Sequence, residues 1–301
     1  MTINSKYKDQ VALLLEVIEP ALDDSRLALK GGTAINLFTM NMPRLSVDLD
    51  LVYLPVTGRD EFLVGIQDVF QKMKMRLGKH DTEVMQTAEK TPKQIRIYNA
   101  TTEVKVEVNL VLRGSVYPPR LMELCPRAQT DFEKSVKILC TSFEDQYAGK
   151  FCAALDRQHP RDLFDVKLFF EKNNITEQLK RAFLVYLISG NRPIHEMIHP
   201  NLLDQRSLFA DQFQGMAYVE TTYEELEAAR DLLIANIDVS LNQDDRDFLI
   251  SVKKGIPNWG LLGIPGIEDF PGVRWKLMNI KKMGSDRQKD MLSKLEKKLS
   301  L

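Results

Sequence analysis

Hydrophobic and polar positions follow two different periods along the chain. Apolar residues recur at helical spacing over residues 11–22, 34–40 and 59–77. Short apolar or alternating runs, which are typical of strands, cover residues 27–29, 46–54, 82–86, 94–98, 102–112 and 136–140. The pattern therefore predicts a mixed sheet with flanking helices in the first part of the chain.

The second part of the chain has helical periodicity only. The predicted helices cover residues 143–155, 161–171, 177–189, 223–237 and 243–253. Mixed strands and helices followed by helices alone indicate an α+β fold with two domains. We predict an α/β domain over residues 1–140 and a mainly helical domain over residues 141–301.

Composition excludes several classes of protein. The 301 residues carry a formal net charge of −1 and are 44% apolar, which is average for a globular protein. No uninterrupted apolar run approaches the roughly 18–20 residues that a membrane span needs. The polar N-terminus does not resemble a secretory signal. We therefore expect a cytoplasmic protein with no membrane partner.

Cysteines, histidines and glycines lack several common functional spacings. An odd count of three cysteines is not a disulfide framework, and the four histidines are too scattered for a structural zinc site. The sequence has no Gly-x-Gly-x-x-Gly, no Gly-x-x-x-x-Gly-Lys-Ser/Thr and no Gly-x-Ser-x-Gly. The sequence therefore lacks the motifs typical of dinucleotide-binding proteins, P-loop proteins and α/β-hydrolases.

The predicted strand over residues 46–54 carries a pair of acids. Alternate residues of a strand point to one face, so Ser46, Asp48 and Asp50 project together while the apolar residues between them project to the other side. Two carboxylates held this close repel each other unless a cation compensates them. Mg²⁺ suits such oxygen ligands, with Mn²⁺ as an alternative.

A third carboxylate is available on a later strand. Residues 102–112 alternate so that Lys105, Glu107 and Asn109 share one face. If this strand pairs beside residues 46–54, Glu107 meets Asp48 and Asp50. Three carboxylates can hold two metal ions about 3.5–4 Å apart, which suits phosphoryl chemistry. A carboxylate is the better Mg²⁺ ligand, but Asn109 remains the alternative third ligand.

Two glycines precede the acids at the start of a predicted helix. Gly31 and Gly32 allow the backbone to approach a phosphate closely, and the helix start offers free N–H groups. Thr33 can donate its hydroxyl to the same phosphate.

The order of these pieces resembles a known superfamily. Residues 30–34 are Lys-Gly-Gly-Thr-Ala, and residues 44–50 are Arg-Leu-Ser-Val-Asp-Leu-Asp. This order resembles the polymerase-β-type nucleotidyltransferases, in which a glycine turn, an Asp-x-Asp strand and a third acid follow one another. The likeness is closer to the AbiEii/AbiGii family of nucleotidyltransferase toxins, although Val47 separates the serine from the first aspartate.

A second block agrees with that family. Lys150 and Arg157 lie on one face of a predicted helix, and His-Pro-Arg-Asp-Leu-Phe-Asp follows at residues 159–165. The resemblance implies catalytic roles for Asp48, Asp50, Glu107, Lys150 and Asp162, with the first three also binding metal. It implies nucleotide binding by Gly31, Gly32, Thr33, Arg44, Ser46, Lys150 and Arg157. From the residues alone, Asp162 can instead be a helix N-cap after Pro160.

The resemblance also implies an activity. It implies an NTP- and Mg²⁺-dependent toxin of a toxin–antitoxin or abortive-infection (phage-defence) system, which modifies RNA at the 3′ end of tRNA and blocks translation. Such toxins are encoded beside an antitoxin, which is an expected partner. Two alternatives stay open: transfer to a protein or small molecule, and a non-catalytic interaction module. A basic tail over residues 272–301 is either an RNA contact or a solvated helix that docks on the core.

Overall fold

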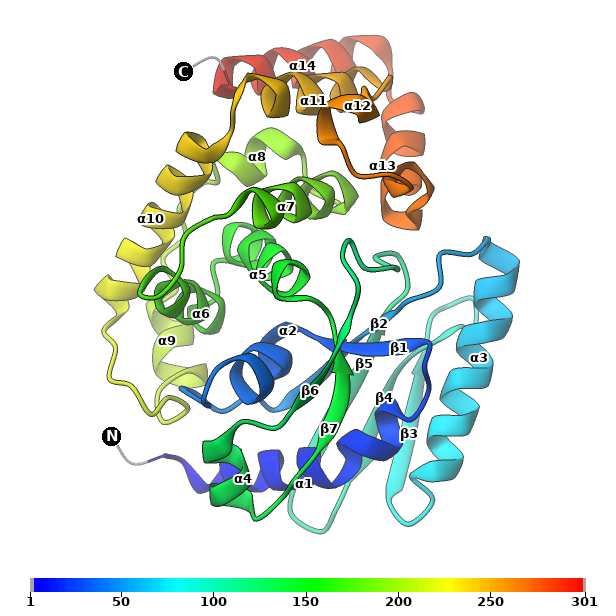
Figure 1. Ribbon diagram of the computed structural model, residues 1–301, viewed down its shortest axis with the longest axis vertical. Helices are drawn as coiled ribbons and strands as arrows, with labels where there is room; N and C mark the ends of the chain where they lie inside the picture. The colour runs from blue at the N-terminus through cyan, green and yellow to red at the C-terminus, as the bar shows by residue number, and fades with distance from the viewer. Residues whose placement is uncertain (1–2, 300–301) are drawn as a thin grey trace. The chain divides into compact units, whose positions relative to one another are not determined.

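A computed structural model describes residues 3–299 of the protein. The chain forms two compact units (Figure 1). The first unit contains the chain up to Gln146 together with a returning segment, Gln212–Glu220. The second contains Tyr147–Asp211 and the chain from Thr221 onward. The fold class is α+β, as predicted.

A seven-stranded sheet of order β3-β4-β5-β2-β1-β7-β6 organises the first unit. Its strands are β1 (Leu27–Lys30), β2 (Asp48–Tyr53), β3 (Asp81–Gln86), β4 (Pro92–Tyr98), β5 (Glu103–Asn109), β6 (Arg120–Glu123) and β7 (Lys137–Cys140). β2 pairs antiparallel with β1 and parallel with β5, so β2 and β5 lie side by side. The hydrophobic pattern missed β6, since most of this edge strand is exposed and carries no apolar alternation.

The helices of the first unit are α1 (Ser5–Leu22), α2 (Gly31–Thr33), α3 (Arg59–Arg76) and α4 (Pro126–Phe132). The predicted helix over residues 34–40 is a π-helix, Ala34–Thr39, that continues from α2. The predicted strand over residues 102–112 ends at Asn109. The reason is local, because the Asn109 side-chain oxygen accepts hydrogen bonds from the backbone N–H groups of Val111 and Leu112, which turns the chain.

The two faces of the sheet differ in burial, as the alternation predicts. α1 lies against β5, and Val104, Val106 and Val108 of that strand are fully buried in the core. Lys105 and Glu107, which point to the opposite face, are only partly buried. One face of the sheet therefore builds the hydrophobic core, and the other is free to present polar chemistry.

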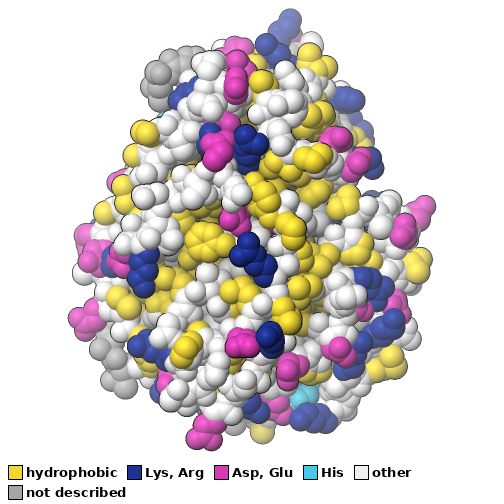
Figure 2. Space-filling view, in the orientation of Figure 1, with side chains coloured by type: hydrophobic (Ala, Val, Ile, Leu, Met, Phe, Trp, Pro, Cys, Tyr) yellow, Lys and Arg dark blue, Asp and Glu magenta, His cyan; other side chains and the backbone are white. Residues whose placement is uncertain are grey.

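The second unit is helical. It contains most of α5 (Phe143–Arg157), followed by α6 (Pro160–Phe170), α7 (Glu177–Ser189), α8 (Ile194–Ile198), α9 (Arg206–Gln212), α10 (Tyr223–Ser240), α11 (Gln243–Lys254), α12 (Trp259–Leu262), η2 (Ile267–Asp269), α13 (Pro271–Lys281) and α14 (Ser285–Leu299). Among residues 3–299, no helix is both long and apolar enough to cross a membrane. On the face shown in Figure 2, basic and acidic side chains are interspersed, in keeping with the net charge of −1.

Candidate active site

Neighbouring strands bring the three predicted carboxylates onto one face of the sheet. In the parallel pairing of β2 with β5, Asp50 stands opposite Glu107 and Asp48 stands opposite Lys105. Residues in register on adjacent strands point to the same side of a sheet. All three acids are partly buried, so their carboxylates remain reachable from solvent. The arrangement is a row of three negative charges across two strands.

The glycine turn lies directly against this row. Gly31 has a φ of +73°, and a Cβ atom built there would lie 2.7 Å from Asp50 Oδ2. A Cβ atom on Gly32 would lie 2.9 Å from Arg44 Nη2 and 3.0 Å from Ser46 Oγ. Gly31 favours glycine because of its positive φ, and a side chain at either position would push the residues behind the turn out of place. The predicted turn and the predicted acids are therefore one site.

Thr33 holds the acidic strand in place through its hydroxyl. Its Oγ1 lies 2.5 Å from the Asp48 carbonyl oxygen and 2.9 Å from Ser46 Oγ. A carbonyl can only accept, so the Thr33 hydroxyl donates to it and accepts from the Ser46 hydroxyl. Both side chains are buried. Their contacts fix the start of β2, and the phosphate contacts expected of Thr33 and Ser46 stay predictions.

Arg44 is buried behind the same turn, although an arginine in such a motif would be expected to reach solvent. Only 2% of Arg44 is exposed, and its Nη1 donates to the Leu45 carbonyl over 2.9 Å. The returning segment pairs with this stretch, since Arg44 bridges to Ala217 and Leu45 N–H donates to Met216 over 2.8 Å. Nothing in the local sequence indicates that residues 212–220 contact the residues just before β2.

Lys105 is a charged neighbour of the acids to which the sequence pattern assigned no role. Its Nζ lies 3.1 Å from Glu107 Oε2. Burial alone would lower the pKa of Lys105, but Asp48, Glu107 and Asp50 together raise it above its usual value. The ammonium is therefore charged among the acids.

The oxygen donors of this row suit a hard divalent cation. Within the part of the chain that the structure describes, no three His, Cys, Asp or Glu side chains converge as a ready-made metal site. The Glu107 carboxylate faces Lys105 instead. Three partly exposed carboxylates beside a glycine turn nonetheless fit the oxygen chemistry of Mg²⁺. Asn109 fits less well, because its side-chain oxygen already accepts two backbone hydrogen bonds.

The predicted residues of the second block form a buried ion-pair cluster in the second unit. Lys150 Nζ lies 2.8 Å from both Asp162 Oδ1 and Asp165 Oδ2. Arg157 Nε lies 2.6 Å from Asp162 Oδ2. The Lys150, Asp162 and Asp165 side chains are at most 6% exposed, whereas that of Arg157 is 62% exposed. Of the two cations, Arg157 is thus the one that extends into solvent.

Local structure explains how α6 presents Asp162. His159 is the N-cap of α6, and its Nδ1 accepts a hydrogen bond from the Arg161 N–H over 3.1 Å. Pro160 occupies the first turn, where its missing N–H costs nothing. The interpretation of Asp162 as the N-cap is wrong. Its carboxylate lies in the first turn and bonds Lys150 and Arg157 instead.

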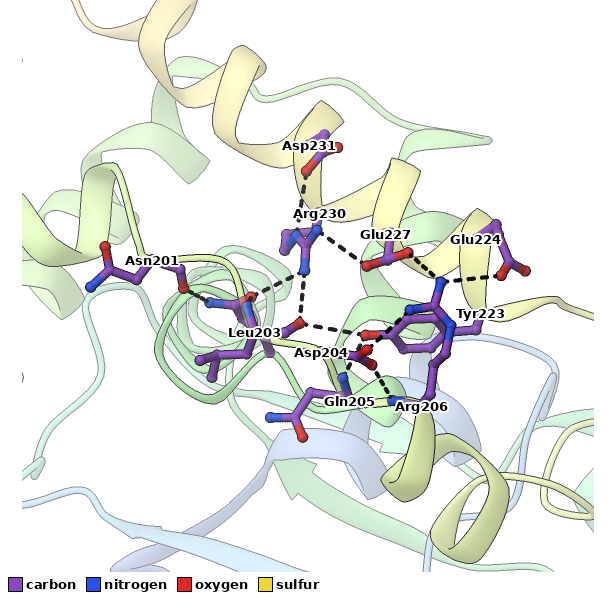
Figure 3. A network of polar contacts seen from close by, with 11 residues as sticks. Asn201, Leu203, Asp204, Gln205, Arg206, Tyr223, Glu224, Glu227, Arg230 and Asp231 are labelled. Carbon is purple, nitrogen blue, oxygen red and sulfur yellow. Dashed lines mark hydrogen bonds and ion pairs between the residues drawn. The ribbon is translucent and has the colours of Figure 1, made fainter.

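A polar network that the sequence pattern missed anchors the chain just after Arg157 (Figure 3). Gln158 has a φ of +48°, and its side chain is buried. Its Nε2 donates to the Asn201 carbonyl over 2.7 Å, and its Oε1 accepts from Leu203 N–H. Arg230, only 4% exposed, donates to Gln158 Oε1 and to the Leu203 carbonyl. The network fixes the turn between α5 and α6.

The Asp162 cluster makes stability sensitive to acid. Burial by itself would raise the pKa of Asp162, but Lys150 and Arg157 hold it well below its usual value of about 3.9. The ionised carboxylate stabilises the fold above that value, and this stabilisation is lost as the pH falls below about 4. We expect Asp162→Asn to flatten the decline of the melting temperature between pH 5 and 3 relative to wild type. Asp244→Asn, at an exposed acid, is the control; equal slopes for all three proteins would contradict the ion pairing.

Comparison with known proteins identifies the family and the fold. A family model described as "Nucleotidyl transferase AbiEii toxin, Type IV TA system" matches residues 12–279. The fold is similar to that of MenT4, a nucleotidyltransferase toxin from Mycobacterium tuberculosis H37Rv, with a TM-score of 0.59. That match has 17% sequence identity and covers 89% of this chain and 93% of the other. A search of curated proteins finds no significant sequence match.

Proposed function

The chain belongs to the AbiEii family of nucleotidyltransferase toxins of type IV toxin–antitoxin systems, and from that premise we propose that it transfers a nucleotide from an NTP to the 3′ end of tRNA. The observation that carries the proposal is the register of β2 with β5, which sets Glu107 opposite Asp50 and beside Asp48. Transfer to this end would block aminoacylation and translation. A cognate antitoxin is the expected protein partner.

Asp48, Asp50 and Glu107 would hold Mg²⁺, with two ions expected and Mn²⁺ as a substitute. When bound, the metal would neutralise triphosphate charge and favour the ionised acceptor hydroxyl. The Gly31–Gly32 backbone would approach the phosphates at the start of the helical segment.

The proposed transfer is a nucleophilic displacement at the α-phosphorus of the NTP. The acceptor hydroxyl oxygen bonds to the α-phosphorus, the bond from that phosphorus to the bridging oxygen breaks, and pyrophosphate leaves. Glu107, which stands opposite Asp50 on the neighbouring strand, would take the hydroxyl proton as a general base. The nucleotide-binding roles of Lys150 and Arg157 and the catalytic role of Asp162 stay predictions; of the two cations, Arg157 has the exposed guanidinium, which Asp162 holds in place.

Incubation with labelled NTPs, Mg²⁺ and total tRNA tests the proposal. Label on tRNA that disappears after removal of the 3′-terminal nucleotides supports it. Label on protein, or on a small molecule only, favours the alternative acceptors. No label with any of the four NTPs, from a folded protein that arrests growth, contradicts nucleotide transfer.

The C-terminal helices supply a basic surface for the RNA backbone. Leu295 and Leu299 of α14 are buried, and α14 packs on α11 and α8, so this helix docks on the core. The exposed lysines of this tail include Lys281, Lys282, Lys297 and Lys298. Changing all four to glutamine should weaken tRNA binding and lower the slope of log Kd against log salt by about one for each lost phosphate contact. Titrations at several salt concentrations measure the slope, and identical slopes for the variant and the wild type would remove these four lysines from the RNA site.

Gly31→Ala should disturb the site more than the fold. The new Cβ would meet Asp50 Oδ2 at 2.7 Å, and a φ of +73° strains alanine. A shift of the reacting groups by about 1 Å costs roughly 100-fold in rate, while the backbone strain costs about 1–2 kcal/mol of stability. Gly58→Ala is the matched control, because a Cβ there meets nothing within 4 Å. Wild-type transfer by Gly31→Ala would contradict the closeness of the turn to Asp50.

A further inference from the structure

Lys105 occupies a central position on the acidic face of the sheet. Its Nζ contacts Glu107 Oε2 at 3.1 Å, and its backbone stands in register with Asp48. On its other side, Arg96 of β4 stands in register with it. Lys105 is therefore in the row of acids, whereas Arg96 is one strand further away and pairs with Glu103 at 3.7 Å.

Three carboxylates on adjacent strands need positive charge whether or not metal is present. Like charges on neighbouring positions repel one another, and more strongly where the site is only partly hydrated. The Lys105 ammonium lies 3.1 Å from Glu107 Oε2, on a backbone position opposite Asp48. Lys105 thus supplies positive charge from within the chain.

A divalent cation and the Lys105 ammonium compete for the Glu107 carboxylate. The ammonium lies 3.1 Å from Glu107 Oε2, and a metal ion bound by the same carboxylate would repel it. The Lys105 and Glu107 side chains are 36% and 44% exposed, so the lysine has solvent into which it can swing.

We propose that Lys105 is a positioning residue that serves as a built-in counter-cation, holding Glu107 and the aspartates together without metal and leaving Glu107 when a divalent cation binds. The inference rests on the proposed function, because it takes Asp48, Asp50 and Glu107 as the metal-binding carboxylates. It adds a step that the acids alone do not specify: metal entry is an exchange of one cation for another.

Direct binding of Mn²⁺, followed by electron paramagnetic resonance of the free ion, tests the exchange. Lys105→Met keeps the aliphatic stem and removes the charge, and we expect it to bind Mn²⁺ about tenfold more tightly than wild type. Arg96→Gln is the matched control, since it removes a cation one strand away, and should bind as wild type does. Unchanged affinity in Lys105→Met overturns the proposal. Weaker binding also overturns it, because Lys105 would then orient Glu107 for the metal.

A double-mutant cycle in chelator-treated protein tests the counter-cation role without metal. Lys105→Met should lower the melting temperature by about 2–4 °C. The loss should shrink to near zero in the Glu107→Gln background, where one of the repelling charges is gone. Equal losses in both backgrounds would overturn the pairing. If the cycle shows coupling but wild type binds no Mn²⁺ at millimolar concentration, the metal site of the proposed function fails and the exchange step with it.

Discussion

Asp50→Asn is expected to reduce nucleotide transfer by roughly 1,000-fold while the protein remains folded. Asp50 contacts the glycine turn and faces Glu107, so every proposed role of the site involves its carboxylate. Stability should stay the same or rise, because the change removes one of three neighbouring negative charges. Label transfer to tRNA, growth after induction and a melting curve measure the two effects separately. Asp48→Asn should behave in the same way.

The control lies on the same face of the same sheet. Glu103 is on β5, four residues before Glu107, and is exposed. Glu103→Gln should transfer nucleotide at the wild-type rate, and Glu107→Gln should not. Full activity of Asp50→Asn would contradict the assignment of the acids. Activity that survives Glu107→Gln but is lost in Asn109→Ala would make Asn109 the third ligand.

Lys150→Met should destabilise the protein by about 3–5 kcal/mol. Lys150 is the partner shared by Asp162 and Asp165, which are both almost fully buried. Removing its charge takes away the cation shared by two buried carboxylates, and the ion pair of Asp162 with Arg157 replaces it only in part. That cost is a large fraction of the roughly 5–15 kcal/mol by which folded proteins are stable. Urea unfolding followed by circular dichroism measures it.

Two further variants make this result specific. Lys294→Met removes an exposed lysine that pairs with Asp290, and should cost less than about 1 kcal/mol. Adding Asp162→Asn and Asp165→Asn to Lys150→Met should restore much of the stability, because the two buried side chains that lost the Lys150 cation are then neutral. If Lys150→Met alone unfolds at the same urea concentration as wild type, the ion pairs of Lys150 with Asp162 and Asp165 do not stabilise the fold. A stable triple variant without activity would indicate that the cluster also serves catalysis.

Local backbone geometry explains what could be predicted about the acidic site. The two-residue period of a strand places Asp48 with Asp50, and Lys105 with Glu107, whatever the strands later pack against. The same period separates these residues from the valines and leucines that build the core. Gly31 was identifiable as a turn because few other residues accept its conformation. Irregular or exposed elements such as β6 have no such period and were missed.

Contacts between residues that are far apart in the sequence could not be predicted in the same way. The alternation of residues 102–112 suggested that Glu107 could meet the aspartates, but only strand pairing decided that it stands opposite Asp50. The burial of Arg44 depends on residues 212–220. This segment belongs to the first unit, although in the sequence it follows Tyr147–Asp211 of the second unit. Arg230 reaches the turn after Arg157 from α10, more than 70 residues along the chain.

The amino-acid sequence by itself therefore determined which side chains share a face, where the glycine turn lies and which family the chain resembles, because these depend on neighbours a few residues apart. The tertiary structure alone decided which strand lies beside β2, that Lys105 neutralises the acids and that Lys150 is shared by two buried aspartates. Those contacts join distant segments through packing and charge compensation. The periodicity of hydrophobic residues along the sequence cannot predict them, because it depends only on residues close together in the chain.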